Sequence, residues 1–226
     1  MPFRIPFAGD GEVFTPDSVL SHCYGALLPM FTTKEATTLR QLCREFKSTV
    51  ADFPWEYEKT VIRGSVAAWR ACFPRARWAN VTQAHWQAEC RMTPVVDADF
   101  VHFVGLRRLT MRFCTSVSDA AFVHLKGMHT LDMSFCDQDT ITDAAFVHLK
   151  GIHSLSLYNC LQLTSAVFTH LQGVKRLNIG WCEQLNLTDE SLKGIEWLGM
   201  YDHSQTQVEM AKSLGYPVDT EFSTSI

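Results

Sequence analysis

The sequence predicts an α/β solenoid with parallel strands on its concave face, and two observations lead to this fold class. Four cysteines are separated by 22, 24 and 22 residues: Cys114, Cys136, Cys160 and Cys182. Residues 119–136 and 143–160 are identical at 12 of their 18 positions. A unit of about 20–29 residues buries its apolar side only by stacking on its neighbours, so such repeats form an elongated, open structure. A solenoid of this kind is usually a surface that binds another macromolecule.

About five repeats are expected over residues 97–202, each with a short helix, a tight turn, a strand and a return. They begin at Asp97, Asp119, Asp143, Ser165 and Asp189. One buried column of the strands consists of Leu109, Leu131, Leu155, Leu177 and Leu198. A second column, two residues along as strand alternation requires, consists of Met111, Met133, Leu157, Ile179 and Met200. Residues 203–226 are expected to form a C-terminal cap and tail, with a closing helix from Gln205 to Leu214.

Residues 13–55 have a different pattern, which predicts two short helices. The first begins at Thr15-Pro16, a capping side chain before a proline. A capping box at residues 32–35 opens the second, which is expected to end before Phe53 and to carry on one face Leu39, Leu42, Cys43, Phe46 and Val50. Two helices of this length cannot easily form a stable core alone. They therefore need the solenoid or a partner to cover their apolar faces.

Residues 56–96 are expected to connect these helices to the repeats and to cap the solenoid. Ser65 can cap a helix that Pro74 ends. The places that leucines hold in a repeat strand are taken by Ala76, Ala79 and Val81. Residues 82–96 and the tail after Asp219 have no assignment.

Composition narrows the class of function. The chain has 226 residues, 46% of them apolar and 19% charged, and a net charge of −4 with its basic residues scattered along the sequence. A nucleic-acid-binding protein normally has a net basic patch, so that class is disfavoured, as is any membrane role. The amino terminus lacks a signal-peptide core because Arg4, Pro6 and Asp10 interrupt it. A cytoplasmic or nuclear location is expected, where thiols stay reduced.

The cysteines and histidines do not match a metal site. The sequence has no C-x-x-C and no H-E-x-x-H, so we expect free, buried thiols that act as small apolar residues, and no cofactor. A column of histidines precedes inward-facing helix residues and is expected at the solvent boundary: His102, His124, His148 and His170. No G-x-S-x-G and no phosphate loop is present, so the chain is not expected to be an enzyme.

The repeats resemble the cysteine-containing class of leucine-rich repeat, in which Leu-x-Leu-x-x-Cys is followed by Ile/Leu-Thr-Asp, as at Thr142-Asp143 and Thr188-Asp189. That class commonly follows an F-box, and residues 16–50 resemble one. Pro16-Asp-Ser-Val-Leu20 is similar to its opening, and Leu39-Arg-Gln-Leu42-Cys43-Arg44 to its close. F-box/leucine-rich-repeat proteins with near-identical repeats are abundant in large DNA viruses of protists, and this chain is similar to them.

The resemblance implies a Skp1-like adaptor as one partner. The apolar contacts to it would come from Pro16, Leu20, Leu27, Leu39 and Leu42. The solenoid's target would then be linked to a cullin-type ubiquitin ligase. Alternatively, these side chains only pack the helices against the first turn of the solenoid.

The second candidate site is the concave strand face, whose side chains flank the buried columns and vary between repeats. Aromatic and arginine side chains are enriched at binding hot spots. The candidate residues are Arg108, Arg112, Phe113, Asp132, Phe135, Tyr158, Asn159, Arg176, Asn178, Trp181, Trp197 and Tyr201. Some of the rings could instead pack sideways on one another.

The leading hypothesis is a non-catalytic substrate adaptor of a ubiquitin ligase, which holds a target protein on the concave face. The alternative is a structural or interaction module, of viral origin for example, in which the amino-terminal helices serve only as a cap.

Overall fold

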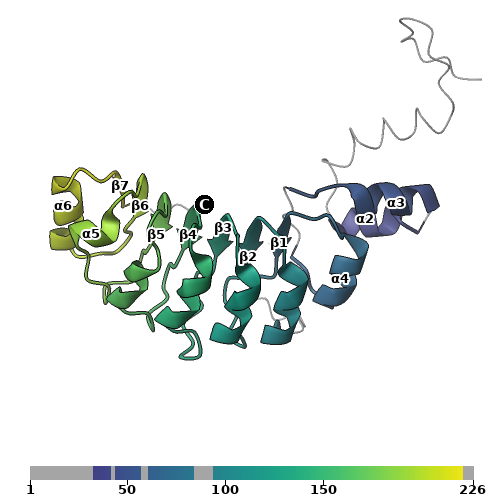
Figure 1. Cartoon of the computed structure of the whole chain (residues 1–226), viewed down its shortest axis with the longest axis horizontal. Coiled ribbons are helices and arrows are strands. Elements are labelled where there is room, and N and C mark those ends of the chain that lie inside the picture. The colour runs from purple at the N-terminus through teal and green to yellow at the C-terminus, as the bar shows by residue number, and fades with distance from the viewer. Residues whose placement is uncertain (1–32, 42–43, 57–60, 84–93, 221–226) are drawn as a thin grey trace, which may run out of the picture.

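The computed structural model describes residues 33–41, 44–56, 61–83 and 94–220, and they form a curved α/β solenoid (Figure 1). Seven parallel strands pair in chain order within one sheet. Their bounds are Trp78–Asn80 (β1), Arg108–Thr110 (β2), Thr130–Asp132 (β3), Ser154–Ser156 (β4), Arg176–Asn178 (β5), Trp197–Gly199 (β6) and Val218–Asp219 (β7). The strands line the inner side of the curve and short helices line its outer side. The predicted fold class is confirmed.

The register of the sheet aligns the expected columns. Leu109 pairs with Leu131, which pairs with Leu155, and the pairing continues through Leu177 to Leu198. All the side chains of this column, and those of the column two residues along, are buried in one continuous core. Ala79 occupies the same place in β1, as the sequence predicts.

The outer helices begin where the sequence places them but are tighter than α-helices. Four are 3-10 helices, Asp97–Phe103 (η2), Asp119–Leu125 (η3), Asp143–Leu149 (η4) and Ser165–Thr169 (η5), and one is an α-helix, Asp189–Leu192 (α5). Each of the last four is capped by the hydroxyl of the preceding residue, as when Thr142 accepts a hydrogen bond from the Ala144 amide. A left-handed glycine soon after the helix then reverses the chain, as at Gly151 (φ 85°).

A ladder of aspartates joins successive helices. Asp119 accepts hydrogen bonds from both the amide and the hydroxyl of Thr142, each at 2.7 Å. Asp97 does the same for Ser118, and Asp143 for Thr164. The pairs Ser118-Asp119 and Thr142-Asp143 therefore each have two roles, because the hydroxyl caps its own helix while the aspartate orients the next cap.

The cysteine column lies in the core beneath the strands. Each thiol donates to the carbonyl of the preceding repeat's second column, as Cys136 does to Met111 at 3.1 Å and Cys182 to Leu157 at 3.0 Å. Burial raises the pKa of Cys136 to about 12 and that of Cys182 to about 11. His203 takes the same place in the last repeat, where its Nε2 lies 2.7 Å from the Ile179 carbonyl. These cysteines are free thiols in the structure, and burial keeps them protonated.

The amino-terminal region differs from the sequence prediction. The second helix was expected to run unbroken to Asp52, but it forms two elements, Thr33–Leu39 (α2) and Arg44–Asp52 (α3). Two consecutive β-branched residues, Thr37 and Thr38, weaken the helix, and the Thr37 hydroxyl donates back to the Thr33 carbonyl at 2.8 Å. The end of α3 just before Phe53 agrees with the prediction.

These helices share the core of the solenoid. Ala36 of α2 and Val50 of α3 are fully buried in it. Trp55 packs edge-on against Phe73, with ring centroids 5.4 Å apart, and its indole N–H donates to the Val50 carbonyl. Phe73 directly follows the helix Val66–Cys72 (α4), which Ser65 caps as predicted. The described part of this region is therefore continuous with the first repeat.

The carboxyl end closes the sheet with two elements. The helix Gln205–Ser213 (α6) agrees with the prediction and buries Val208 and Ala211. The strand β7 was not expected, since the sequence gives it only one buried-type residue, Val218. It covers the hydrogen-bonding edge of β6, because the Leu198 amide donates to the Pro217 carbonyl and the Met200 amide to Asp219.

Candidate protein-binding face

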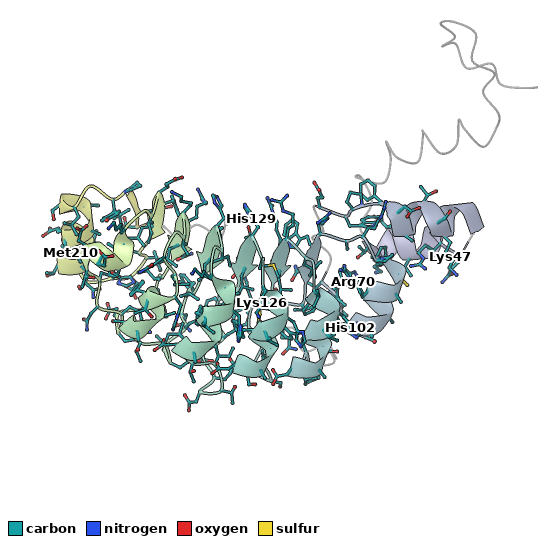
Figure 2. The ribbon with its side chains drawn as sticks, viewed as in Figure 1. Lys47, Arg70, His102, Lys126, His129 and Met210 are labelled. Carbon is teal, nitrogen blue, oxygen red and sulfur yellow. The ribbon has the colours of Figure 1, made fainter. Side chains whose placement is uncertain are left out.

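The inner surface of the sheet carries the side chains that the sequence singled out. Figure 2 shows side chains projecting from the strand side of the ribbon, where His129 lies, away from the helix side, where His102 lies. The strand row that precedes the first buried column runs from Trp78 through Arg108 and Arg176 to Trp197. Successive strands are about 4.8 Å apart, so neighbouring side chains of a row are in contact range.

The polar residues at the centre of the face are buried, which corrects the prediction for two of them. Asp132 is 6% exposed and Asn178 is 7% exposed. Arg112 forms an ion pair with Asp132, whose other oxygen accepts from the Ser134 hydroxyl at 2.6 Å. The side-chain oxygen of Asn178 (Oδ1) accepts from the Gly180 amide at 3.0 Å. Side chains from adjacent strands cover these groups, so they organise the face rather than present charge to a partner.

Tyr158 is also covered, contrary to the expectation that it points to solvent. It is 7% exposed because its ring lies across Gly180, where an added Cβ would come within 2.8 Å of it. Its centroid is 6.3 Å from that of Trp181 and 6.4 Å from that of Tyr201. Burial is the main cause that raises the pKa of the Tyr158 hydroxyl, and Tyr201 adds to it. The tyrosine is thus a support for the two rings beside it.

A row of aromatic residues follows the strands in the left-handed backbone conformation, a feature that the sequence did not reveal. Phe113 has φ 60°, Phe135 61° and Trp181 59°. Bulky residues rarely adopt this conformation, which costs on the order of 1–3 kcal/mol. Their amides compensate by bonding to the next strand, as the Phe135 amide does to the Tyr158 carbonyl at 2.8 Å and that of Trp181 to Tyr201 at 2.9 Å. Asn159 and Asp202 take the same conformation in the same row.

This backbone turn stacks the rings along the carboxyl edge of the sheet. Phe113 and Phe135 are parallel, with centroids 4.4 Å apart, and Tyr158 packs against Phe135 at 5.1 Å. The last aromatic residue of the row is Trp181, which is 45% exposed. The sideways packing that the sequence left open therefore occurs, and it leaves one large apolar ring available at the end of the row.

The opposite edge of the sheet is charged. Arg176 lies over the Trp197 ring at 4.8 Å, and Arg108 lies over Trp78 at 5.7 Å. His129 and His153 stack with centroids 4.6 Å apart. Lys175 forms an ion pair with Glu196 at 2.9 Å. Two of these pairs, Arg176–Trp197 and Arg108–Trp78, include predicted face residues.

The predicted adaptor contacts are not described by the structure. Pro16, Leu20, Leu27 and Leu42 lie outside the described residues, and so does the side chain of Leu39, the last residue of α2. The adaptor site therefore stays a prediction.

The histidine column lies on the outer helices, half-buried, as predicted: His102, His124, His148 and His170. Among the described residues, no group of three histidine, cysteine or acidic side chains could hold a metal ion. In that same part of the chain, no helix has the length and apolar character needed to cross a membrane.

Comparison with known proteins adds nothing to the description of the fold or the site. No protein-family model matches the chain, and no curated protein matches it. Among solved structures, the chain is similar to one described as the crystal structure of the Rad7 and Elc1 complex in yeast, at 14% identity and a TM-score of 0.33. The matched region is 48% of this chain and 40% of that one. This likeness is too weak to inform function.

Proposed function

We propose that the chain is a non-catalytic interaction protein whose concave sheet binds a target protein. The observation that carries this proposal is the aromatic row of the carboxyl edge, which ends in the exposed ring of Trp181. Exposed tryptophan on a rigid support is typical of a binding hot spot. The open curve of the sheet favours contact with a protein surface over capture of a small molecule in a closed pocket.

The rigidity of the row supports this function. Trp181 is held by its backbone bond to Tyr201 and by the Tyr158 ring, so little side-chain freedom remains to be lost on binding. Interfaces whose side chains are ordered in advance lose less entropy on association and bind more tightly for the same area. The backbone strain at Trp181 has a role under this proposal, because it aims the ring across the end of the sheet.

Affinity purification of the full chain followed by mass spectrometry would identify the target. Trp181→Ala should then weaken binding about tenfold or more, as expected of a central aromatic contact. Val147→Ala is the matched control, since Val147 is an exposed apolar residue of η4 on the outer side. Equal retention of the target by the two variants would refute binding at the carboxyl edge.

We further propose that the amino-terminal segment docks on a Skp1-like adaptor and so links the target to a cullin-type ubiquitin ligase. The support is the resemblance of residues 16–50 to an F-box. The continuous core from Ala36 to the solenoid adds a physical reason, because it would fix the distance between adaptor and target. The work of the chain would be positional, raising the effective concentration of target lysines near the ligase.

Co-expression of the chain with a Skp1-like protein tests this second proposal. A stable complex should form, and the double variant Leu20→Asp/Leu42→Asp should lose it while circular dichroism shows the solenoid still folded. Leu161→Asp is the control, because Leu161 is an exposed leucine of the solenoid. If no complex forms although the target still binds, the chain is an interaction module whose amino-terminal helices only cap the repeats.

A further inference from the structure

The residue immediately before each strand forms a continuous row along the amino edge of the sheet. The row runs from Arg77 to Arg107, His129, His153, Lys175 and Glu196. From Arg77 to Lys175, each carbonyl of the row accepts from two amides of the next strand segment, as the Arg107 carbonyl does from His129 at 3.0 Å and Thr130 at 2.9 Å. The same paired bonds recur at His129 and His153. The backbone thus holds these side chains in register at about 4.8 Å intervals.

The amino edge gathers positive charge in a protein whose net charge is −4. Five basic side chains lie in this row or at the first strand position beside it: Arg77, Arg107, Arg108, Lys175 and Arg176. Glu56 lies at the first-repeat end, and Glu196 at the other. Basic residues that are scattered along the sequence are thus gathered at one edge of the sheet, because successive strands pair in register.

Most of this charge has no acidic partner within the described residues. Lys175 is paired with Glu196, whereas Arg108 and Arg176 lie over indole rings rather than against carboxylates. This excess of positive charge affects His129, near the centre of the row. Partial burial lowers the pKa of His129 first, and His153, Arg107 and Arg108 lower it further. Such a histidine is surrounded by cations that an incoming anion would neutralise.

The edge is also hollowed. Glu56, Arg77, Arg107, Arg108 and His129 line a depression of about 140 Å³. Arg107 and Arg108 are exposed beside it, so their guanidinium groups can present donors to a ligand without leaving their places. Guanidinium binds carboxylate through two parallel hydrogen bonds, which gives both strength and direction.

We propose that this amino edge binds an acidic, extended segment of the target protein, with aspartate and glutamate carboxylates placed along the row from Arg77 to Arg176. The inference rests on the proposed function and adds the chemistry of the partner. Four strand steps separate Arg77 from Arg176, or about 19 Å, a length that about six extended residues cover.

The limits of the row favour a peptide over a nucleic acid. Glu56 and Glu196 stand at its two ends and would repel a phosphate backbone that continued beyond it. A short acidic segment, in contrast, can fit between these two glutamates. The net negative charge of the chain likewise disfavours a polyanion that extends across other surfaces.

Fluorescence anisotropy with a labelled ten-residue glutamate–serine peptide tests the proposal on the full chain. The peptide should bind more tightly than a serine–glutamine peptide of equal length, and addition of salt should weaken it. Arg107→Gln/Arg108→Gln should reduce the affinity about five- to tenfold. Lys47→Gln/Lys212→Gln, which removes the same charge from exposed lysines at the two ends of the ribbon, should change it less than twofold.

Two outcomes would overturn the inference. One is an equal loss in both double variants, which would mean that net charge alone attracts the peptide. The other is tighter binding of a single-stranded thymidine decamer than of the acidic peptide. The target-binding assay separates this inference from the proposed function, since Trp181→Ala should weaken target binding about tenfold or more and leave peptide binding intact. A target that binds Arg107→Gln/Arg108→Gln at full strength would refute the inference alone.

Discussion

The two edges of the sheet share one backbone ladder but differ in chemistry. At the carboxyl edge, left-handed residues turn aromatic rings onto one another, and the polar groups beside them are buried. At the amino edge, the residues just before each strand carry arginine side chains that are exposed and histidine and lysine side chains that are half-buried. The repeats therefore share the same buried columns but carry two different surfaces, one at each edge of the sheet.

This difference shows how a short solenoid can combine two kinds of contact. Contact with an aromatic ring is short-ranged and little affected by salt, whereas contact with a basic row acts over about 8–10 Å and weakens as salt is added. The ion pairs illustrate the same division, since Arg112–Asp132 is largely covered at the face and Lys175–Glu196 is exposed at the amino edge.

Removal of a shared core residue should affect both edges together and has the largest expected effect. Leu155→Ala opens a cavity in the fully buried column and should lower the free energy of unfolding by about 2–5 kcal/mol. Urea denaturation followed by circular dichroism measures this loss. Val147→Ala, on an exposed residue, should change it by less than about 0.5 kcal/mol. A similar loss of unfolding free energy in both variants would contradict the prediction that the two edges depend on a shared core.

The two ion pairs should differ in their contribution to stability. Asp132→Asn replaces a buried acceptor with an amide that cannot satisfy both Arg112 and Ser134, and should cost about 2–3 kcal/mol. Glu196→Gln removes an exposed partner of Lys175 and should cost about 0–1 kcal/mol. The midpoints of chemical denaturation give both values. Equal costs would mean that the face and the amino edge are solvated alike.

The aromatic row is supported by the Tyr158 ring, which can lie across residue 180 only because that residue is a glycine. Gly180→Ala places a methyl group within 2.8 Å of the Tyr158 ring and should destabilise the fold by about 1–3 kcal/mol, with weaker binding at Trp181. Gly64→Ala is the matched control, because no atom lies within 4 Å of its added Cβ. Thermal unfolding compares the two variants, and NMR of the Tyr158 ring reports its displacement. An unshifted ring in Gly180→Ala would show that Gly180 does not position it.

The buried thiols should give the smallest effect, visible only at high pH. The pKa of Cys136 is raised from 9.0 in the unfolded chain to about 12 by burial. Between these values the unfolded state releases a proton that the native state retains, so the free energy of unfolding falls as pH rises from about 9 to about 12. Cys136→Ser should reduce this slope, because serine does not ionise in that range. Denaturation series at pH 8 and pH 10 measure it, and an unchanged slope would contradict the assignment.

The core and caps were predictable because they repeat in the sequence. The spacing of Leu131 and Leu155 set the register, and the Thr-Asp pairs set where helices begin. Even the irregular last repeat followed the pattern, since His203 replaces the cysteine and bonds to the same column of carbonyls. The 3-10 form of the helices was not predictable from spacing alone, because both helix types begin with the same cap.

The site was less predictable because it depends on contacts between repeats. Asp132 and Tyr158 lie at outward positions of their strands, and only the neighbouring Ser134 and Gly180 explain why they are covered. The charged edge, in contrast, has a signal in the sequence. Its residues stand one or two positions before the column leucines, so aligning the repeats by that column would have revealed them.

The aspartate ladder has a consequence for how the chain can change in length. Residues 119–142 offer Asp119 to Thr142, and the following unit offers Asp143 to Thr164 in the same way. An inserted copy of such a unit would carry both the aspartate that accepts and the threonine that donates to it. Duplication of the corresponding gene segment could therefore add one repeat at a time without changing the hydrogen bonds of the neighbouring repeats. The near-identity of residues 119–136 and 143–160 is the trace that such an event would leave.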